Sequence, residues 1–74
     1  MANNANTKIS RNLAPRQQQV CALIADAKTN KEIADILGLS DGSVKEYIHQ
    51  IMRKLDARNR VEVATRWLQS QTHV

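Results

Sequence analysis

Several residue types are scarce in this chain, and each scarcity removes a class of structure. Cys21 is the only cysteine, so no internal disulfide can form, and no cysteine or histidine pair has zinc-site spacing. Phenylalanine is absent, and Tyr47 and Trp67 are the only aromatic residues, which argues against a surface that stacks single-stranded bases. No apolar run approaches membrane-spanning length, and residues 1–12 lack the apolar centre of a secretory signal.

The length and the single thiol set further bounds. With 74 residues the chain has room for one domain and one modest core, which helix packing must stabilise. A lone thiol fits a reducing compartment, so we expect a cytoplasmic protein. We also expect no metal, cofactor, membrane contact or small-molecule ligand for this domain. An enzyme is not expected either, because Asp41, Ser43 and His49 share one short helical span and cannot converge as a triad.

What the chain does have is positive charge, unevenly placed. The net charge is +4, and the sequence between residues 43 and 66 carries most of the excess. A basic C-terminal half suits a polyanion such as nucleic acid, although charge alone is equally compatible with an ordinary solvated surface. The basic residues of this segment are Lys45, Arg53, Lys54, Arg58, Arg60 and Arg66.

Apolar spacing predicts an all-α domain of four helices, preceded by a flexible polar arm over residues 1–12. The first helix is expected to begin at Pro15, with a buried stripe at Val20, Leu23, Ile24 and Ala27. Thr29 and Glu32 form a capping-box pattern that starts a short second helix, in which Ile33, Ala34 and Leu37 are expected to be buried.

The third and fourth helices are expected over about 41–55 and from about residue 60 to Ser70. Ser40 can cap the third helix, and Asn59 with Glu62 offers a capping pair for the fourth. Val44, Ile48, Ile51, Met52 and Leu55 form the core side of the third helix.

The turn between the second and third helices is the most informative segment. Ala34 allows the two helices to approach closely, Gly38 permits a sharp left-handed turn, and Leu39 fills the space beneath it. Val44 then docks the third helix on the second. This spacing is typical of a helix-turn-helix, in which the second helix of the pair enters the DNA major groove.

At this point the sequence resembles the LuxR/NarL-type (GerE-like) helix-turn-helix domain of bacterial transcription regulators. The segments that carry the resemblance are "PR" at 15–16, "TNKEIADILGLS" at 29–40, "SVK" at 43–45, "IMRKL" at 51–55 and "RNRVEVA" at 58–64. The resemblance implies a LuxR-type domain over residues 13–74 that binds double-stranded DNA as a dimer on paired half-sites. It also implies a role in transcription regulation, for example as a response regulator output domain.

The outward face of the third helix supplies the expected base contacts. Lys45 can donate to guanine, and the resemblance makes it the first candidate; Glu46 and His49 occupy positions that the resemblance assigns to base contact. Gln50 could pair with adenine if it reaches the base. The expected phosphate contacts are Asn30, Lys31, Ser43, Tyr47, Arg53, Lys54, Arg58 and Arg60.

The fourth helix carries two apolar stripes. Val61, Ala64 and Leu68 are expected to seat it on the core, which leaves the opposite stripe for a homodimer interface. The alternative is that Trp67 folds back over the edge of the domain. The expected interface residues are Val63, Trp67, Ser70 and Val74.

Three departures from the family pattern concern local geometry. Ala14 stands where a threonine or serine would cap the first helix, at a cost of roughly 1 kcal/mol. Tyr47 replaces a histidine, and Asp56 replaces a glycine after Leu55, where aspartate tolerates the left-handed conformation.

Other functions stay open on the sequence alone. One is a protein-interaction module that binds another regulator through the Trp67 face, and another is a sigma-factor-like promoter-reading domain; RNA polymerase is a further candidate partner. Met1 favours a complete small regulator over the end of a longer one. The operator, the inducing signal and the choice between activation and repression are not encoded in any feature of the sequence.

Overall fold

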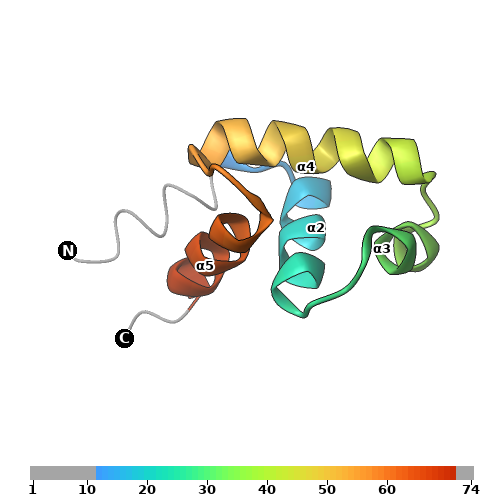
Figure 1. Ribbon diagram of the computed structural model, residues 1–74, viewed down its shortest axis with the longest axis horizontal. Coiled ribbons are helices and arrows are strands. Elements are labelled where there is room, and N and C mark those ends of the chain that lie inside the picture. The colour runs from blue at the N-terminus through green and yellow to red at the C-terminus, as the bar shows by residue number, and fades with distance from the viewer. Residues whose placement is uncertain (1–11, 72–74) are drawn as a thin grey trace.

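The computed structural model describes residues 12–71. This part of the chain forms four helices and no strand: α2 (Pro15–Ala25), α3 (Asn30–Leu37), α4 (Asp41–Leu55) and α5 (Arg60–Gln71). The expected all-α class is confirmed, whereas the expected arm lies, except for Asn12, outside the described residues. α4 runs along one side of the molecule, and the other helices lie on the opposite side of it (Figure 1). Within residues 12–71 no helix is long and apolar enough to cross a membrane.

α2 begins at Pro15 as predicted, although its N-cap has no side-chain acceptor. Gln17 compensates in part, because its Oε1 accepts a hydrogen bond of 2.9 Å from the backbone N–H of Ala14. The helix ends earlier than the expected stripe requires. Ala27 was predicted to be buried, but it lies exposed in the turn after the helix. Its φ of 62° is left-handed, so the helix ends before this residue and does not carry it to the core.

The helix-turn-helix forms by the predicted local interactions. The Thr29 side chain accepts from the N–H of Glu32, while the Glu32 carboxylate accepts from the N–H of Thr29, so the capping box is complete. Gly38 ends α3 with a φ of 68°, and Ser40 caps α4 by accepting from the N–H of Ser43 at 3.0 Å. The short linkage fixes α4 at an angle to α3.

Asp56 follows the last residue of α4 and adopts the expected left-handed conformation with a φ of 53°. The Asn59 side chain accepts from the N–H of Glu62 at 2.9 Å and starts α5. The other half of the expected capping pair is different, because Glu62 accepts from the N–H of Arg58 instead of that of Asn59.

One buried cluster joins the four helices. Ile33 from α3 and Val63 from α5 are both fully buried in it, so helices that are distant in the sequence share one core. Cys21 is buried beside them, and the loss of water raises the pKa of its thiol to about 12, so the sulfur acts as a small apolar group. The largest fully buried side chains are Val20, Cys21, Ile33, Val44, Ile51 and Val63.

Candidate nucleic-acid interface

The face of α4 opposite the core carries a row of polar side chains. Val44 and Ile51 are fully buried and hold the helix against its neighbours. Lys45, Glu46 and His49, the first three predicted base contacts, are all exposed on the other side. Gln50, the fourth predicted base contact, is half-buried on the same surface. Of the predicted phosphate contacts on α4, Arg53 and Lys54 are exposed, whereas Ser43 and Tyr47 are half-buried.

A shallow hollow of about 300 Å³ lies along this surface of α4. Its lining residues are Ser43, Glu46, Tyr47 and Gln50, one helical turn apart in two pairs. Ser43 is also tied to the helix cap, because its hydroxyl accepts from the Ser40 hydroxyl at 3.0 Å. The hollow brings together two predicted base contacts, Glu46 and Gln50, and two predicted phosphate contacts, Ser43 and Tyr47.

A buried glutamine on α2 contacts this surface from behind. Gln17 is 5% exposed, and its Nε2 donates to Oε1 of Gln50 at 3.1 Å. Its Oε1 accepts from Nζ of Lys54 at 3.0 Å, so two predicted DNA contacts are held by one residue of another helix. We did not predict Gln17 as a site residue. Its place three residues after Ala14 signals the capping contact, but nothing local in the sequence signals the contacts with α4.

The N-terminal end of α3 is tied to α5. The guanidinium of Arg60 donates to Oδ1 of Asn30 and to the backbone oxygen of Lys28. Both Arg60 and Asn30 are half-buried, and each was predicted to contact phosphate. The structure instead joins them to each other, so a phosphate contact by either would compete with this internal contact. Lys31 beside them is exposed.

The pattern of a capped α3, a left-handed Gly38 and an exposed basic α4 agrees with the comparison with protein families. The model described as "Bacterial regulatory proteins, luxR family" matches residues 5–67 of the chain. The chain belongs to the LuxR family of bacterial regulatory proteins. It contains the LuxR-type DNA-binding domain of transcription regulators, a family of regulators and not of enzymes.

Curated relatives agree with the family. The transcriptional regulatory protein DesR of Bacillus subtilis is 44% identical over 54 residues, which cover 73% of this chain and 27% of the relative. The two-component response regulator PprB of Pseudomonas aeruginosa is 40% identical over 52 residues, or 70% and 19% of the two chains. The transcriptional activator protein CarR of Pectobacterium carotovorum is 40% identical over 57 residues, or 77% and 23%. The chain thus spans about a quarter of the length of these relatives. No solved structure matches significantly.

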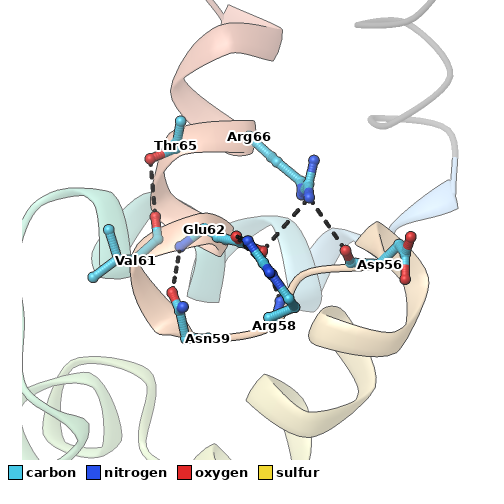
Figure 2. A network of polar contacts seen from close by, with 7 residues as sticks. All are labelled: Asp56, Arg58, Asn59, Val61, Glu62, Thr65 and Arg66. Carbon is cyan, nitrogen blue, oxygen red and sulfur yellow. Dashed lines mark hydrogen bonds and ion pairs between the residues drawn. The ribbon is translucent and has the colours of Figure 1, made fainter.

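In this LuxR-family chain, the turn between α4 and α5 contains a network of charged groups (Figure 2). Glu62 accepts from the backbone N–H of Arg58 at 2.8 Å and forms an ion pair of 2.9 Å with its guanidinium. These contacts lower the pKa of Glu62, chiefly through the backbone hydrogen bond, and raise that of Arg58, chiefly through the side-chain hydrogen bond. Arg66 donates to the backbone oxygen of Asp56 at 3.2 Å and lies 3.6 Å from Glu62. Arg58, a predicted phosphate contact, is therefore already paired within the domain.

The exposed and buried faces of α5 differ from the prediction, and of the stripe expected to seat this helix only Ala64 packs against the core. Val63, Trp67 and Ser70 were expected on an exposed interface, but they are only 0%, 9% and 5% exposed. The alternative that Trp67 folds onto the domain is the one observed, because its large apolar surface completes the core. Val61 and Leu68, which were expected to seat the helix, are 72% and 48% exposed.

Two further predictions concern the interface and metal binding. Val74, the fourth predicted interface residue, lies outside the described residues. Among residues 12–71, no group of His, Cys, Asp and Glu side chains is arranged to hold a metal ion.

Proposed function

We propose that this LuxR-type domain binds double-stranded DNA sequence-specifically, with α4 in the major groove. The observation that carries the proposal is the exposure of Lys45, Glu46 and His49 on the face of α4 opposite its buried stripe. A helix presented in this way by a short turn fits the major groove, where base edges differ in their donors and acceptors. DNA binding places the protein in the cytoplasm, where bacterial DNA lies.

Phosphate contacts would flank these base contacts. Lys31 at the start of α3 and Arg53 on α4 are exposed, and Ser43 and Tyr47 are accessible along the hollow. Arg58, Arg60 and Asn30 have internal partners, so we assign them the role of holding the surface in place. Lys54 can serve both roles, because its ammonium has three donors and Gln17 uses one.

The proposed binding unit is a homodimer on paired half-sites, formed through the exposed side of α5. Val61, Thr65 and Leu68 lie on this side, at spacings of four and three residues. This surface replaces the Trp67 stripe as the proposed interface. Because Trp67 is buried, the alternative of a module that binds another regulator through that face has no exposed surface there. A two-fold pairing of this kind would set the separation of two recognition helices on the duplex.

The decisive experiment is selection of bound sequences from a random pool of duplexes, followed by titration at several salt concentrations. The wild-type chain should enrich a motif with two related halves, and its affinity should fall steeply as salt rises. Lys45→Ala should cost about 1–3 kcal/mol of discrimination at one base pair.

Lys31→Ala is the matched control, since it removes one exposed lysine from a predicted phosphate contact. It should weaken binding to all duplexes alike and reduce the salt slope by about one, while the enriched motif stays the same. Equal loss of discrimination in both variants, or no enrichment by the wild-type chain, would contradict the proposal.

A further inference from the structure

A chain of hydrogen bonds runs from the start of α2 to the outer surface of α4. The backbone N–H of Ala14 and the ammonium of Lys54 both donate to Oε1 of Gln17, at 2.9 and 3.0 Å. Nε2 of Gln17 donates to Oε1 of Gln50 at 3.1 Å. Nε2 of Gln50 then donates toward Glu46 across 3.5 Å, at the edge of the hollow on α4.

The groups at the inner end of this series of hydrogen bonds determine which atom donates and which accepts along it. A backbone N–H and an ammonium can only donate, so the oxygen of the Gln17 amide must face them. The nitrogen of Gln17 is then the atom that faces Gln50, and the oxygen of Gln50 must face inward to accept from it. Each amide therefore has one satisfactory orientation, although amide oxygen and nitrogen are otherwise easily exchanged.

The part of the Gln50 amide that faces away from Gln17 is consequently its NH₂ group, which is a donor. An unrestrained glutamine can present both a donor and an acceptor to adenine, as expected from the sequence, but this one has its acceptor occupied by Gln17. In the major groove, guanine offers acceptors at O6 and N7 and thymine at O4, adenine offers the acceptor N7 beside an amino donor, and cytosine offers only an amino donor. A donor at position 50 therefore favours guanine, thymine or adenine over cytosine.

We propose that Gln17, which would touch no DNA itself, is a positioning residue that determines base preference by orienting the Gln50 amide. The inference rests on the proposed function. It assigns to the domain a preference against cytosine at the base that Gln50 reaches. Burial makes Gln17 suited to this role, since at 5% exposure water cannot replace its partners.

Gln17→Glu tests the proposal with a small change. Glutamate keeps the acceptor for Ala14 and Lys54 and is favourable at this position of a helix, so the fold should persist. It has no donor for Gln50, whose amide should turn so that its nitrogen faces inward and its oxygen outward. Circular dichroism should show unchanged helix content.

The first measurement is made on the free protein. The side-chain NH₂ of Gln50 should exchange rapidly with water in the wild-type chain and several-fold more slowly in Gln17→Glu, where it becomes an inner donor. Nuclear magnetic resonance of the side-chain amides measures both rates. An exchange rate that does not change, or a protected Gln50 amide in the wild-type chain, would overturn the proposal.

The second measurement is duplex selection with the wild-type chain and the variant. The preference at one base should move from guanine or thymine, which offer only acceptors, toward cytosine, which offers only a donor, by roughly fivefold for a single hydrogen bond. In a Gln50→Ala background the same Gln17→Glu change should leave the base preference unaltered, because the side chain that contacts the base is missing. A uniform loss of affinity with no change of motif would overturn the proposal and indicate that Gln17 only stabilises the fold.

The two measurements separate the possible failures. A wild-type chain that enriches a motif, together with an unaltered motif in Gln17→Glu, refutes the role of Gln17 and leaves the proposed function intact. A wild-type chain that enriches no duplex refutes the proposed function and the base preference with it. The amide exchange rates then still show whether Gln17 orients Gln50.

Discussion

At the scale of single residues, several polar side chains that were predicted from the sequence to contact DNA have partners inside the domain. Arg60 binds Asn30, Arg58 binds Glu62, and Lys54 contacts the buried Gln17. Each pairing uses a long side chain that reaches a different helix or a neighbouring turn. The charged surface available to a polyanion is therefore smaller than the count of basic residues suggests, and it is concentrated on α4.

Glu62 has a role that the pH dependence of stability should show. Its contacts with Arg58 lower the pKa of its carboxyl group below the ordinary value for glutamate, so the folded state binds this proton less readily than the unfolded state. The stabilisation is fully present above the unfolded pKa and is lost as pH falls through the folded pKa. We expect Glu62→Gln to lower the melting temperature at pH 7, and the gap from the wild type to narrow as pH falls through the lowered, folded-state pKa of Glu62.

The melting temperature measured at intervals between pH 3 and pH 7 checks this expectation. Glu32→Gln serves as a positive control, since the capping box with Thr29 also lowers the pKa of Glu32. A gap that is constant across the range would show that Glu62 acts through its shape and packing and not through its charge.

At the scale of elements, three of the four helices end in the same way. Ala27, Gly38 and Asp56 all have left-handed backbones, with φ of 62°, 68° and 53°. After each of them, the next N–H bonds to the carbonyl five residues back, with distances of 3.0, 2.9 and 2.9 Å. This is the hydrogen-bond pattern of the Schellman motif, for which glycine is preferred because it has no Cβ. Only one of the three positions has glycine.

Substitutions at two of these positions should therefore have opposite effects. Ala27→Gly relieves a left-handed strain of about 1–2 kcal/mol and loses about 0.4–1 kcal/mol through unfolded-chain entropy, so the net gain should be roughly 0.5–1 kcal/mol. Gly38→Ala should lose a similar amount. An added Cβ at Gly38 would meet no atom within 4 Å, so only the backbone conformation is responsible. Thermal unfolding should show shifts of roughly 3–5 °C in opposite directions.

Gly38→Asn provides the control for this interpretation, because asparagine tolerates the left-handed region better than alanine at a larger size. It should be destabilised less than Gly38→Ala. The reverse order would indicate that crowding, and not backbone strain, limits this turn.

The success of the sequence predictions differs between elements for a physical reason. The start of α3, its end at Gly38 and the start of α4 depend on interactions between residues three to five apart, and these elements were predicted correctly. The end of α2 was missed, because alanine gives no signal for a left-handed turn. Ala27 adopts it only because the chain must turn there to let α3 reach the core.

At the scale of the whole molecule, the orientation of α5 could not be settled by spacing. Val61, Ala64 and Leu68 and the set of Val63, Trp67 and Ser70 both recur at helical intervals, so either could face the core. The structure selects the set with the larger apolar area. The contacts of Gln17 with Gln50 and of Asn30 with Arg60 were likewise beyond the sequence. Each joins residues at least 30 positions apart, and only the packed helices bring them together.

This orientation leads to different expectations for two neighbouring residues of α5. Trp67→Ala should cost about 3–5 kcal/mol, which is most of the stability of a domain of this size, so the helix content should fall. Leu68→Gln changes a side chain that is already 48% exposed, so the fold should persist. If the exposed side of α5 joins two copies on DNA, Leu68→Gln should weaken binding to a duplex with two half-sites by about tenfold, and binding to a single half-site very little.

Ile36→Gln is the matched control, since Ile36 is an apolar residue of similar exposure, 55%, on α3 instead of α5. Titration of duplexes with one and with two half-sites should leave the ratio of affinities unchanged in this variant. An unchanged ratio in Leu68→Gln as well would contradict a dimer through α5. An intact fold in Trp67→Ala would contradict the packing on which the choice of interface depends, because Trp67 covers the core only if Val61 and Leu68 face outward.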